Sequence, residues 1–325
     1  MGRFQIHRYE LRSRTALNAA APDRRTFPGA LLHDTKTSGY GCIHPWPELG
    51  DAPLNEQLAS LASSPPDSLP LASRAIDCAR IDGEARLDRR SLFEGLTVPS
   101  SHHLWQHNSS DLGAQAKTLI DSGFDAVKVK LGAPVDEAIS TIDCIDQLFS
   151  EAAVRLRIDF NSTLDPGSFL AFIEGVSDST RKRIELVEDP FINDPLARNF
   201  LPDDVQALVA VDRDFDPSEP LRGAAFGVLK PAVDDFEDLH PESGNLLVTS
   251  YMDHPVGQLW AAYGAARIAA QFPGRLHGAG LLTHQILEGD PALDLIESDG
   301  PHLVPPSGTG LGLDSYLQQL NWRDL

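Results

Sequence analysis

The sequence is poor in cysteine, with only Cys42, Cys78 and Cys144 among its 325 residues. These three are odd in number, lie far apart and form no Cys-x-x-Cys pair, which argues against a disulfide framework and against a thiolate zinc site. Free thiols are typical of a reducing compartment, so we expect a cytoplasmic protein. The first residues also lack the apolar stretch of a secretory signal, so we expect no such signal.

Long apolar runs and an excess of basic residues are missing as well. No apolar stretch reaches about 18 residues, so we expect no membrane span. Lys and Arg number 27 against 47 Asp and Glu, which gives a net charge of -20. This balance argues against nucleic acid as a partner, because phosphate backbones are bound by clustered Lys and Arg. The hydrophobic fraction of 42% is enough for a large core, whereas the oligomeric state is left open.

What is present divides near residue 98. Residues 1–97 contain alternating segments that predict strands and then segments that predict helices, so we expect a small α+β domain. Between the first two strands, the polar segment 16–28 contains proline and arginine and is predicted to be a mobile loop. The expected strands cover 4–11, 30–33 and 38–44, and the expected helices cover 54–62 and 71–87.

Residues 98–300 alternate between short apolar runs and helical patterns. This alternation predicts parallel strands with right-handed crossovers, and seven or eight such units favour a closed (β/α) barrel over an open sheet. A glycine-rich stretch at 308–312 lies in the last segment, 301–325, which we expect to return to the first domain. The expected strands cover 97–100, 126–130, 156–159, 184–188, 208–212, 227–230, 246–249 and 276–280, and the helices cover 111–122, 135–151, 166–176 and 257–271.

Ionisable residues close five successive runs of the predicted barrel. Asp159, Glu188 and Asp212 each end one run, while Lys130 ends the run before them and Lys230 the run after them. The carboxyl ends of barrel strands form the face on which chemistry is done. One acid alone is more readily explained as a helix cap or a surface ion-pair partner. Three in register on successive strands favour a shared role.

Three carboxylates that converge on one face repel one another unless a cation lies among them. Oxygen ligands without cysteine or a histidine cluster favour Mg²⁺, with Mn²⁺ as the alternative, over zinc. We therefore predict a metal site formed by Asp159, Glu188 and Asp212. Magnesium keeps positions open, so a small carboxylate substrate is the expected partner.

The lysines add a prediction about proton transfer. Lys128 and Lys130 lie two positions apart, so their side chains project from the same side of a strand. Lysine acts as a base only when its pKa falls toward neutrality, and burial beside a second ammonium such as Lys128 has that effect. An edge strand with solvated lysines is the competing interpretation. Lys230 ends an apolar run, where a buried ammonium must be paired or used.

These motifs together resemble the muconate-lactonizing subgroup of the enolase superfamily, and within it the o-succinylbenzoate synthase family. The resemblance covers most of the chain. Gly-x-Gly at 39–41 with Pro-x-Pro at 45–47 is similar to the third strand of the family's capping domain. The barrel motifs are Lys-x-Lys ending at Lys130, Asp-x-Asn at 159–161, Glu-Asp-Pro at 188–190, Asp212, and Leu-Lys-Pro containing Lys230.

The resemblance implies an α/β fold: a modified (β/α)8 TIM-type barrel with an N-terminal α+β capping domain that the C-terminal segment completes. It also implies Mg²⁺ held by the three acids. In the synthase family, Lys130 would remove an α-proton and return it to the departing hydroxyl, while Lys230 would stabilise the dianion as an ammonium; the activity belongs to menaquinone biosynthesis. The alternatives are an N-acylamino acid racemase, a dipeptide epimerase, a muconate cycloisomerase, or a non-catalytic barrel that only binds ligands.

Further residues are predicted to support the site or bind substrate: Lys128, Asn161, Asp214, Ser250, Tyr251, Arg24 and Arg25. Asp214 stands where the family commonly has serine, so it could compete with Asp212 as a metal ligand. Tyr251 and His254 either reshape the pocket or cap the following helix. Arg24 or Arg25 either meets a substrate carboxylate or lies in a surface loop. The histidine pair at 102–103 is predicted to be solvated.

Overall fold

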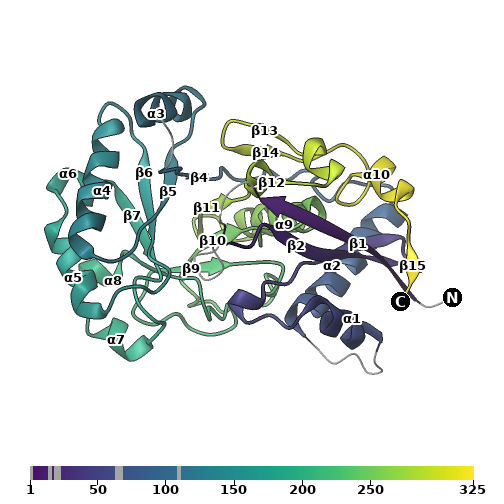
Figure 1. Cartoon of the computed structure of the whole chain (residues 1–325). Coiled ribbons are helices and arrows are strands. Elements are labelled where there is room, and N and C mark those ends of the chain that lie inside the picture. Colours follow the sequence, from purple (N-terminus) through teal and green to yellow (C-terminus); the bar gives the residue numbers. More distant parts are fainter. Residues whose placement is uncertain (1–2, 14–16, 18–22, 63–68, 108–110) are drawn as a thin grey trace.

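The computed structural model describes residues 3–13, 17, 23–62, 69–107 and 111–325 of the chain. A sheet-and-helix cap lies against a ring of parallel strands (Figure 1). Among the described residues, no helix is both long and apolar enough to cross a membrane.

The cap is built around an antiparallel sheet of three long strands, β1 (Phe4–Ser13), β2 (Thr26–Asp34) and β3 (Gly39–Ile43). Helices α1 (Leu54–Ala62) and α2 (Pro70–Leu87) follow it. Helix α2 packs closely on β3 because two glycines leave room for its backbone. An added Cβ would lie 1.8 Å from the Ala79 oxygen at Gly39, and 2.1 Å from the Ala75 oxygen at Gly41. This contact explains the Gly-x-Gly motif physically.

Two short strands from the other end of the chain complete the cap sheet. Strands β12 (Leu287–Glu288) and β15 (Arg323–Asp324) both pair with β1, in agreement with a C-terminal segment that returns to the cap. The start of β1 and the strand β15 therefore lie side by side in Figure 1. The division into 1–97, 98–300 and 301–325 stays a prediction, and β12 falls inside its middle range.

The barrel contains eight parallel strands in sequential order. The ring closes where Ser101 forms a bridge with Ala279, supported by a 2.8 Å bond from the His102 amide to the Ala279 carbonyl. The strands are β4 (His103–Leu104), β5 (Ala126–Lys130), β6 (Arg155–Asp159), β7 (Ile184–Glu188), β8 (Val209–Val211), β9 (Phe226–Leu229), β10 (Asn245–Thr249) and β11 (Leu276–Gly280).

The barrel helices pack outside this ring (Figure 1). No helix forms between β9 and β10, a stretch that the structure describes in full, so the barrel departs there from regular alternation. The outer helices are α3 (Leu112–Asp121), α4 (Val135–Leu148), α5 (Pro166–Gly175), α6 (Asp178–Arg183), α7 (Pro195–Asn199), α8 (Asp203–Gln206) and α9 (Pro255–Gln271). The C-terminal part adds the hairpin β13 (Glu297–Asp299) and β14 (His302–Val304), followed by α10 (Asp314–Gln319).

Two predicted boundaries were wrong. The first barrel strand lies at His103–Leu104, not at 97–100, since Pro99 interrupts that stretch and has no amide hydrogen for a ladder. Strand β2 begins at Thr26, which pairs with Arg12 of β1. The last residues of the predicted 16–28 loop, from Thr26 onward, therefore belong to this strand. Residues 16 and 18–22 of that loop lie outside the described residues.

Candidate active site

A cavity of about 810 Å³ opens at the carboxyl ends of the barrel strands, and the cap covers part of it. Leu17, Glu48 and Asp51 line it from the cap. Arg24 and Arg25 are not among its lining residues. The other ten predicted site residues all line it: Lys128, Lys130, Asp159, Asn161, Glu188, Asp212, Asp214, Lys230, Ser250 and Tyr251.

Strand register brings the charged groups to one level. Lys130 is the direct neighbour of Asp159, and Asp159 is the direct neighbour of Glu188. Asp212 directly follows β8, and Lys230 directly follows β9. Parallel strands in sequential order therefore present the five groups side by side, as the sequence predicts.

The lysines hold the carboxylates in this structure. The Lys128 ammonium lies 3.0 Å from Asp159 Oδ2 and 2.5 Å from Glu188 Oε2, and Lys230 forms an ion pair with Asp212. With the side chains placed in this way, no three His, Cys, Asp or Glu residues in the described parts of the chain are arranged to hold a metal ion. Nevertheless Glu188 Oε1 is buried without a hydrogen-bond partner among the described residues. The donor set, all carboxylate oxygens with one buried oxygen unpaired, fits a hard divalent cation.

The lysines differ in their electrostatic surroundings. Burial lowers the pKa of Lys130 by more than the Asp159 carboxylate raises it, and the Lys128 ammonium lowers it further. Burial also acts to lower the pKa of Lys128, but Asp159 and Glu188 raise it well above its ordinary value. For Lys230, Asp212 likewise outweighs burial and raises the pKa. Only Lys130 of these three is shifted toward the neutral amine.

Left-handed backbone follows three of the site strands. Asn161, Asp189 and Asp214 have φ values of 48°, 39° and 57°, in the left-handed region that Asn and Asp adopt more readily than other residues with a side chain. Hydrogen bonds hold the first two of these turns. The Asn161 amide donates to Asp159 Oδ1 at 2.9 Å, and the Asp189 carboxylate accepts from the Asp212 amide at 2.9 Å. Asp189, the middle residue of the Glu-Asp-Pro motif, thus positions Asp212.

Asp214 is one of the residues that line the cavity, and its carbonyl accepts from Asn193 Nδ2 at 3.4 Å. The proposed competition between Asp214 and Asp212 for a metal stays a prediction. Ser250 shares a 2.7 Å hydrogen bond with Thr283 at the cavity wall.

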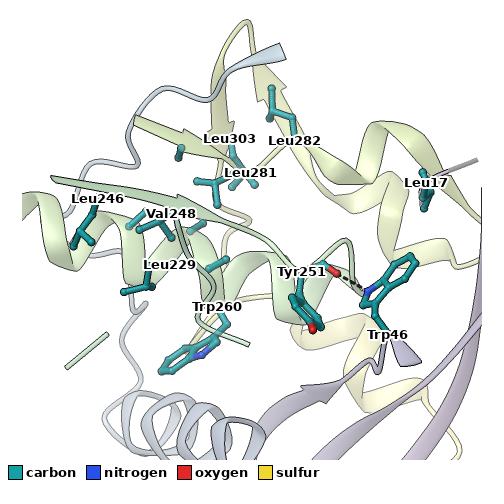
Figure 2. Close-up of a cluster of buried hydrophobic side chains, with 14 of the residues drawn as sticks. Leu17, Trp46, Leu229, Leu246, Val248, Tyr251, Trp260, Leu281, Leu282 and Leu303 are labelled. Atoms are coloured by element: carbon teal, nitrogen blue, oxygen red, sulfur yellow. Dashed lines mark hydrogen bonds between the residues drawn. The ribbon is translucent and has the colours of Figure 1, made fainter. Parts of the chain in front are cut away.

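Tyr251 joins the barrel to the cap. Its hydroxyl donates to Asp51 Oδ2 at 2.9 Å, and its carbonyl accepts from Trp46 Nε1 at 2.8 Å (Figure 2). The Lys230 ammonium lies 6.0 Å from the centre of the Tyr251 ring. His254 instead caps the following helix, because its Nδ1 accepts from the Val256 amide at 3.1 Å. The capping alternative is therefore correct for His254, while Tyr251 contributes to the cavity.

Arg24 faces a partner within the cap. Its Nη1 lies 2.6 and 2.7 Å from the two carboxylate oxygens of Glu48, and its guanidinium stacks on Phe27 and Trp46. Arg25 donates to the Arg24 carbonyl at 3.1 Å. Contact of either arginine with a substrate carboxylate stays a prediction.

The prediction that the histidine pair is solvated was wrong for His102. Its ring is half-buried, lines the cavity and receives a 3.0 Å hydrogen bond at Nδ1 from Arg157. Arg157 lies two residues before Asp159 on β6, so both side chains point to the barrel interior. The two-residue spacing between Arg157 and Asp159 is the sequence signal from which a buried arginine beneath the three carboxylates could have been predicted.

A buried carboxyl beside the site leads to a stability prediction. Burial raises the pKa of Asp253 to about 7, and its Oδ1 lacks a partner among the described residues. An unfolded aspartate titrates near pH ~4, so between about pH 4 and 7 only the unfolded chain loses the proton. Asp253 therefore lowers the free energy of unfolding progressively as the pH rises through this window. We expect Asp253→Asn to stabilise the protein by about 2–4 kcal/mol at pH 8 and little at pH 4.

Urea unfolding at pH 4, 6 and 8 measures this difference. Asp299→Asn, on an exposed residue of β13, is the matched control and should change stability little at any pH. An equal effect of Asp253→Asn at pH 4 and pH 8 would contradict the assignment.

Comparison with known proteins agrees with this architecture. Residues 4–85 match the family model of the o-succinylbenzoate synthase N-terminal domain, and residues 111–214 match the enolase C-terminal domain-like model. An o-succinylbenzoate synthase of Bdellovibrio bacteriovorus is 30% identical over 332 residues, which cover 98% of this chain and 97% of that protein.

Solved structures are similar in fold. A dipeptide epimerase of Enterococcus faecalis, complexed with Mg and the dipeptide L-Leu-L-Tyr, has a TM-score of 0.75 and 17% identity, covering 95% of this chain and 98% of that one. The L-Ala-D/L-Glu epimerase of Bacillus subtilis has a TM-score of 0.76 and 19% identity, covering 95% and 97%. These likenesses establish the modified TIM barrel. From the full-length relative and the two domain matches, the chain belongs to the enolase superfamily, within the group of enzymes related to o-succinylbenzoate synthase.

Proposed function

We propose that this enzyme is a Mg²⁺-dependent o-succinylbenzoate synthase, a dehydratase of menaquinone biosynthesis. The observation that carries the proposal is the row of five charged groups, Lys130, Asp159, Glu188, Asp212 and Lys230, around one cavity at the ends of successive strands. The full-length relative of that name supports the choice of reaction.

Asp159, Glu188 and Asp212 are the residues that would hold the metal. They offer carboxylate oxygens only, and the unpaired buried Oε1 of Glu188 suits a cation that prefers oxygen. When bound there, Mg²⁺ supplies positive charge that offsets the negative charge developing on the substrate carboxylate as its α-proton leaves.

Lys130 is the base in this proposal. Its Nζ lone pair takes the α-proton, and the resulting ammonium donates that proton to the hydroxyl as the carbon–oxygen bond breaks. Water leaves and the neutral amine is regenerated, so the step balances without another reagent. Because one group serves both transfers, proton and hydroxyl depart from the same face of the substrate.

Lys230 keeps its proton throughout. Its ammonium, which pairs with Asp212 in this structure, would oppose the negative charge of the dianion. Lys128 remains between Asp159 and Glu188, where its charge limits the repulsion of the two carboxylates.

The direct test is an absorbance assay with the cyclohexadiene carboxylate precursor, performed with Mg²⁺ and again after chelation. We expect conversion to the aromatic product only with the metal. Folded, metal-supplied protein that does not convert the precursor would contradict the proposal.

The second candidate is a racemase or epimerase of N-acylamino acids or dipeptides. The lysines in the cavity favour it, as do solved relatives of similar fold that are epimerases. Replacing Lys230 by alanine separates the two. In the synthase, we expect dehydration to slow by about 10²–10³-fold, because one charge that stabilises the dianion is lost.

In a racemase, the same Lys230→Ala variant would lose proton exchange from one enantiomer while keeping it from the other. Proton NMR in D2O, with each enantiomer of an N-acylamino acid supplied separately, measures this exchange. One-sided loss of exchange in the variant, with no dehydration by the parent enzyme, would favour the racemase.

A further inference from the structure

His102 lies at the seam where the barrel closes, between the first and eighth strands. Its amide is bonded to the Ala279 carbonyl at 2.8 Å, so the backbone that carries the ring is part of the closed barrel. The imidazole lines the same cavity as Lys128 and Asp159. The proposed reaction does not use this side chain.

The contact with Arg157 determines which ring nitrogen carries hydrogen. Arg157 is only 1% exposed and has no acceptor atom, so the 3.0 Å contact between its Nη1 and His102 Nδ1 must run from arginine to histidine. Its remaining nitrogens are engaged as well: Nε donates to Glu185 Oε2 at 2.6 Å, and Nη2 donates to the His277 carbonyl at 2.8 Å. Nδ1 is therefore an acceptor, and Nε2 carries the ring hydrogen.

The ring also stays neutral. Burial lowers the pKa of His102 well below its ordinary value, and the positive charges of Arg157 and Lys128 lower it further. A neutral imidazole with Nδ1 occupied has one donor left, at Nε2. Among the described residues, Nε2 has no hydrogen-bond partner.

Gly280 makes room for this donor. A Cβ added at Gly280 would lie 2.9 Å from His102 Cε1 and 3.0 Å from Nε2, closer than normal packing allows. The backbone at Gly280 is not left-handed, so the glycine is required for space and not for its conformation. The eighth strand is thus shaped around the outer edge of the His102 ring.

We infer that His102 is a substrate-binding residue whose Nε2–H donates a hydrogen bond to a carboxylate or ketone oxygen of the bound organic acid. The identity of that acid rests on the proposed function. The three acids around the metal site offer only acceptors, so the donors for an anionic substrate are the lysines of the cavity and His102. A neutral donor polarised by the Arg157 cation behind it favours an oxygen that carries negative charge.

The experiment measures binding of o-succinylbenzoate, the product of the proposed reaction, by calorimetry in the presence of Mg²⁺. We expect His102→Phe, which keeps a ring but removes the donor, to weaken binding about tenfold. His102→Gln retains an amide donor and should recover most of the affinity. His302→Phe, at an exposed histidine of β14, is the matched control and should bind as the parent protein does. Full affinity in His102→Phe would overturn the inference.

A purely structural role for His102 would give a different pattern. It would lower the melting temperature in both His102 variants without the recovery of binding by glutamine. Proton–nitrogen NMR of the parent protein adds a second readout: the Nε2–H tautomer should be present in the free protein, and its resonance should move when o-succinylbenzoate binds. A resonance that stays in place at saturation would also overturn the inference.

These readouts separate the two proposals. If the parent protein neither converts the precursor nor binds o-succinylbenzoate, the proposed function fails. The same NMR titration, performed with an N-acylamino acid, then tests whether His102 binds substrate. A shift of the Nε2–H resonance would support the binding role with a different substrate, and no shift would overturn it.

Discussion

Replacement of Lys130 by alanine should lower kcat for dehydration about 10⁴-fold, the largest effect we expect from one substitution. The reason is that Lys130 carries out both proton transfers, and a single well-placed acid–base group contributes up to about 10⁴-fold. Lys130→Arg should lose as much, because a guanidinium remains protonated and cannot accept the α-proton. Steady-state turnover of the cyclohexadiene carboxylate measures both.

The fold should survive this change. Lys130 Nζ donates one hydrogen bond to a described residue, a weak 3.4 Å contact with the Leu17 carbonyl. Lys117→Ala is the matched control, since that lysine is 76% exposed and, within the described part of the chain, forms an ion pair only with Asp121 on its own helix. Normal melting temperatures with activity lost only in the Lys130 variants would support the assignment. An alanine variant that keeps a tenth of the parent activity would exclude Lys130 as the base.

The second large effect concerns metal binding. Glu188→Gln keeps the volume of the side chain but removes the charge of a carboxylate that is 1% exposed. We expect affinity for Mn²⁺, measured by calorimetry on the protein without substrate, to fall by about 100-fold or more, because a neutral amide oxygen is a much weaker ligand than a carboxylate. Mg²⁺ should raise the melting temperature of the parent protein and leave that of the variant unchanged.

Lys128 allows a check on this interpretation. In Glu188→Gln its ammonium keeps the Asp159 carboxylate as a partner, so the variant should fold without metal. Glu297→Gln, at an exposed position of β13, is the control and should bind Mn²⁺ normally. Unchanged metal affinity in Glu188→Gln would show that the three acids do not form the metal site.

The row of charged groups was predictable because each lies at the end of its own apolar run. In a strand, side chains point alternately to the two faces, so the face of each residue follows from its local position. Sequential parallel pairing then places the ends of successive strands next to one another. Lys130, Asp159 and Glu188 needed no further information, because β5, β6 and β7 pair in sequence order. For the same reason the barrel could be predicted, although its first strand could not.

The remaining features depend on contacts between distant segments. The environment of His102 is set by closure of the ring against Ala279 and by the Arg157 side chain beneath Asp159, neither of which has a local pattern. Asp51 and Tyr251 meet across the boundary between cap and barrel. Tyr251 was among the predicted site residues, but its partner Asp51 has a residue type that is common on surfaces, so nothing in the neighbouring sequence distinguishes Asp51.

The strand pairings of the cap have a consequence for biosynthesis. Gln5 pairs with Asp324, and Ile6 pairs with Arg323, whereas each barrel strand after β4 pairs with the barrel strand made just before it. On the ribosome, the barrel can assemble progressively as the nascent chain emerges. The first strand must wait until residues 323–324 have been made before it acquires this neighbour. Completion of the cap is therefore a late event in the maturation of the enzyme.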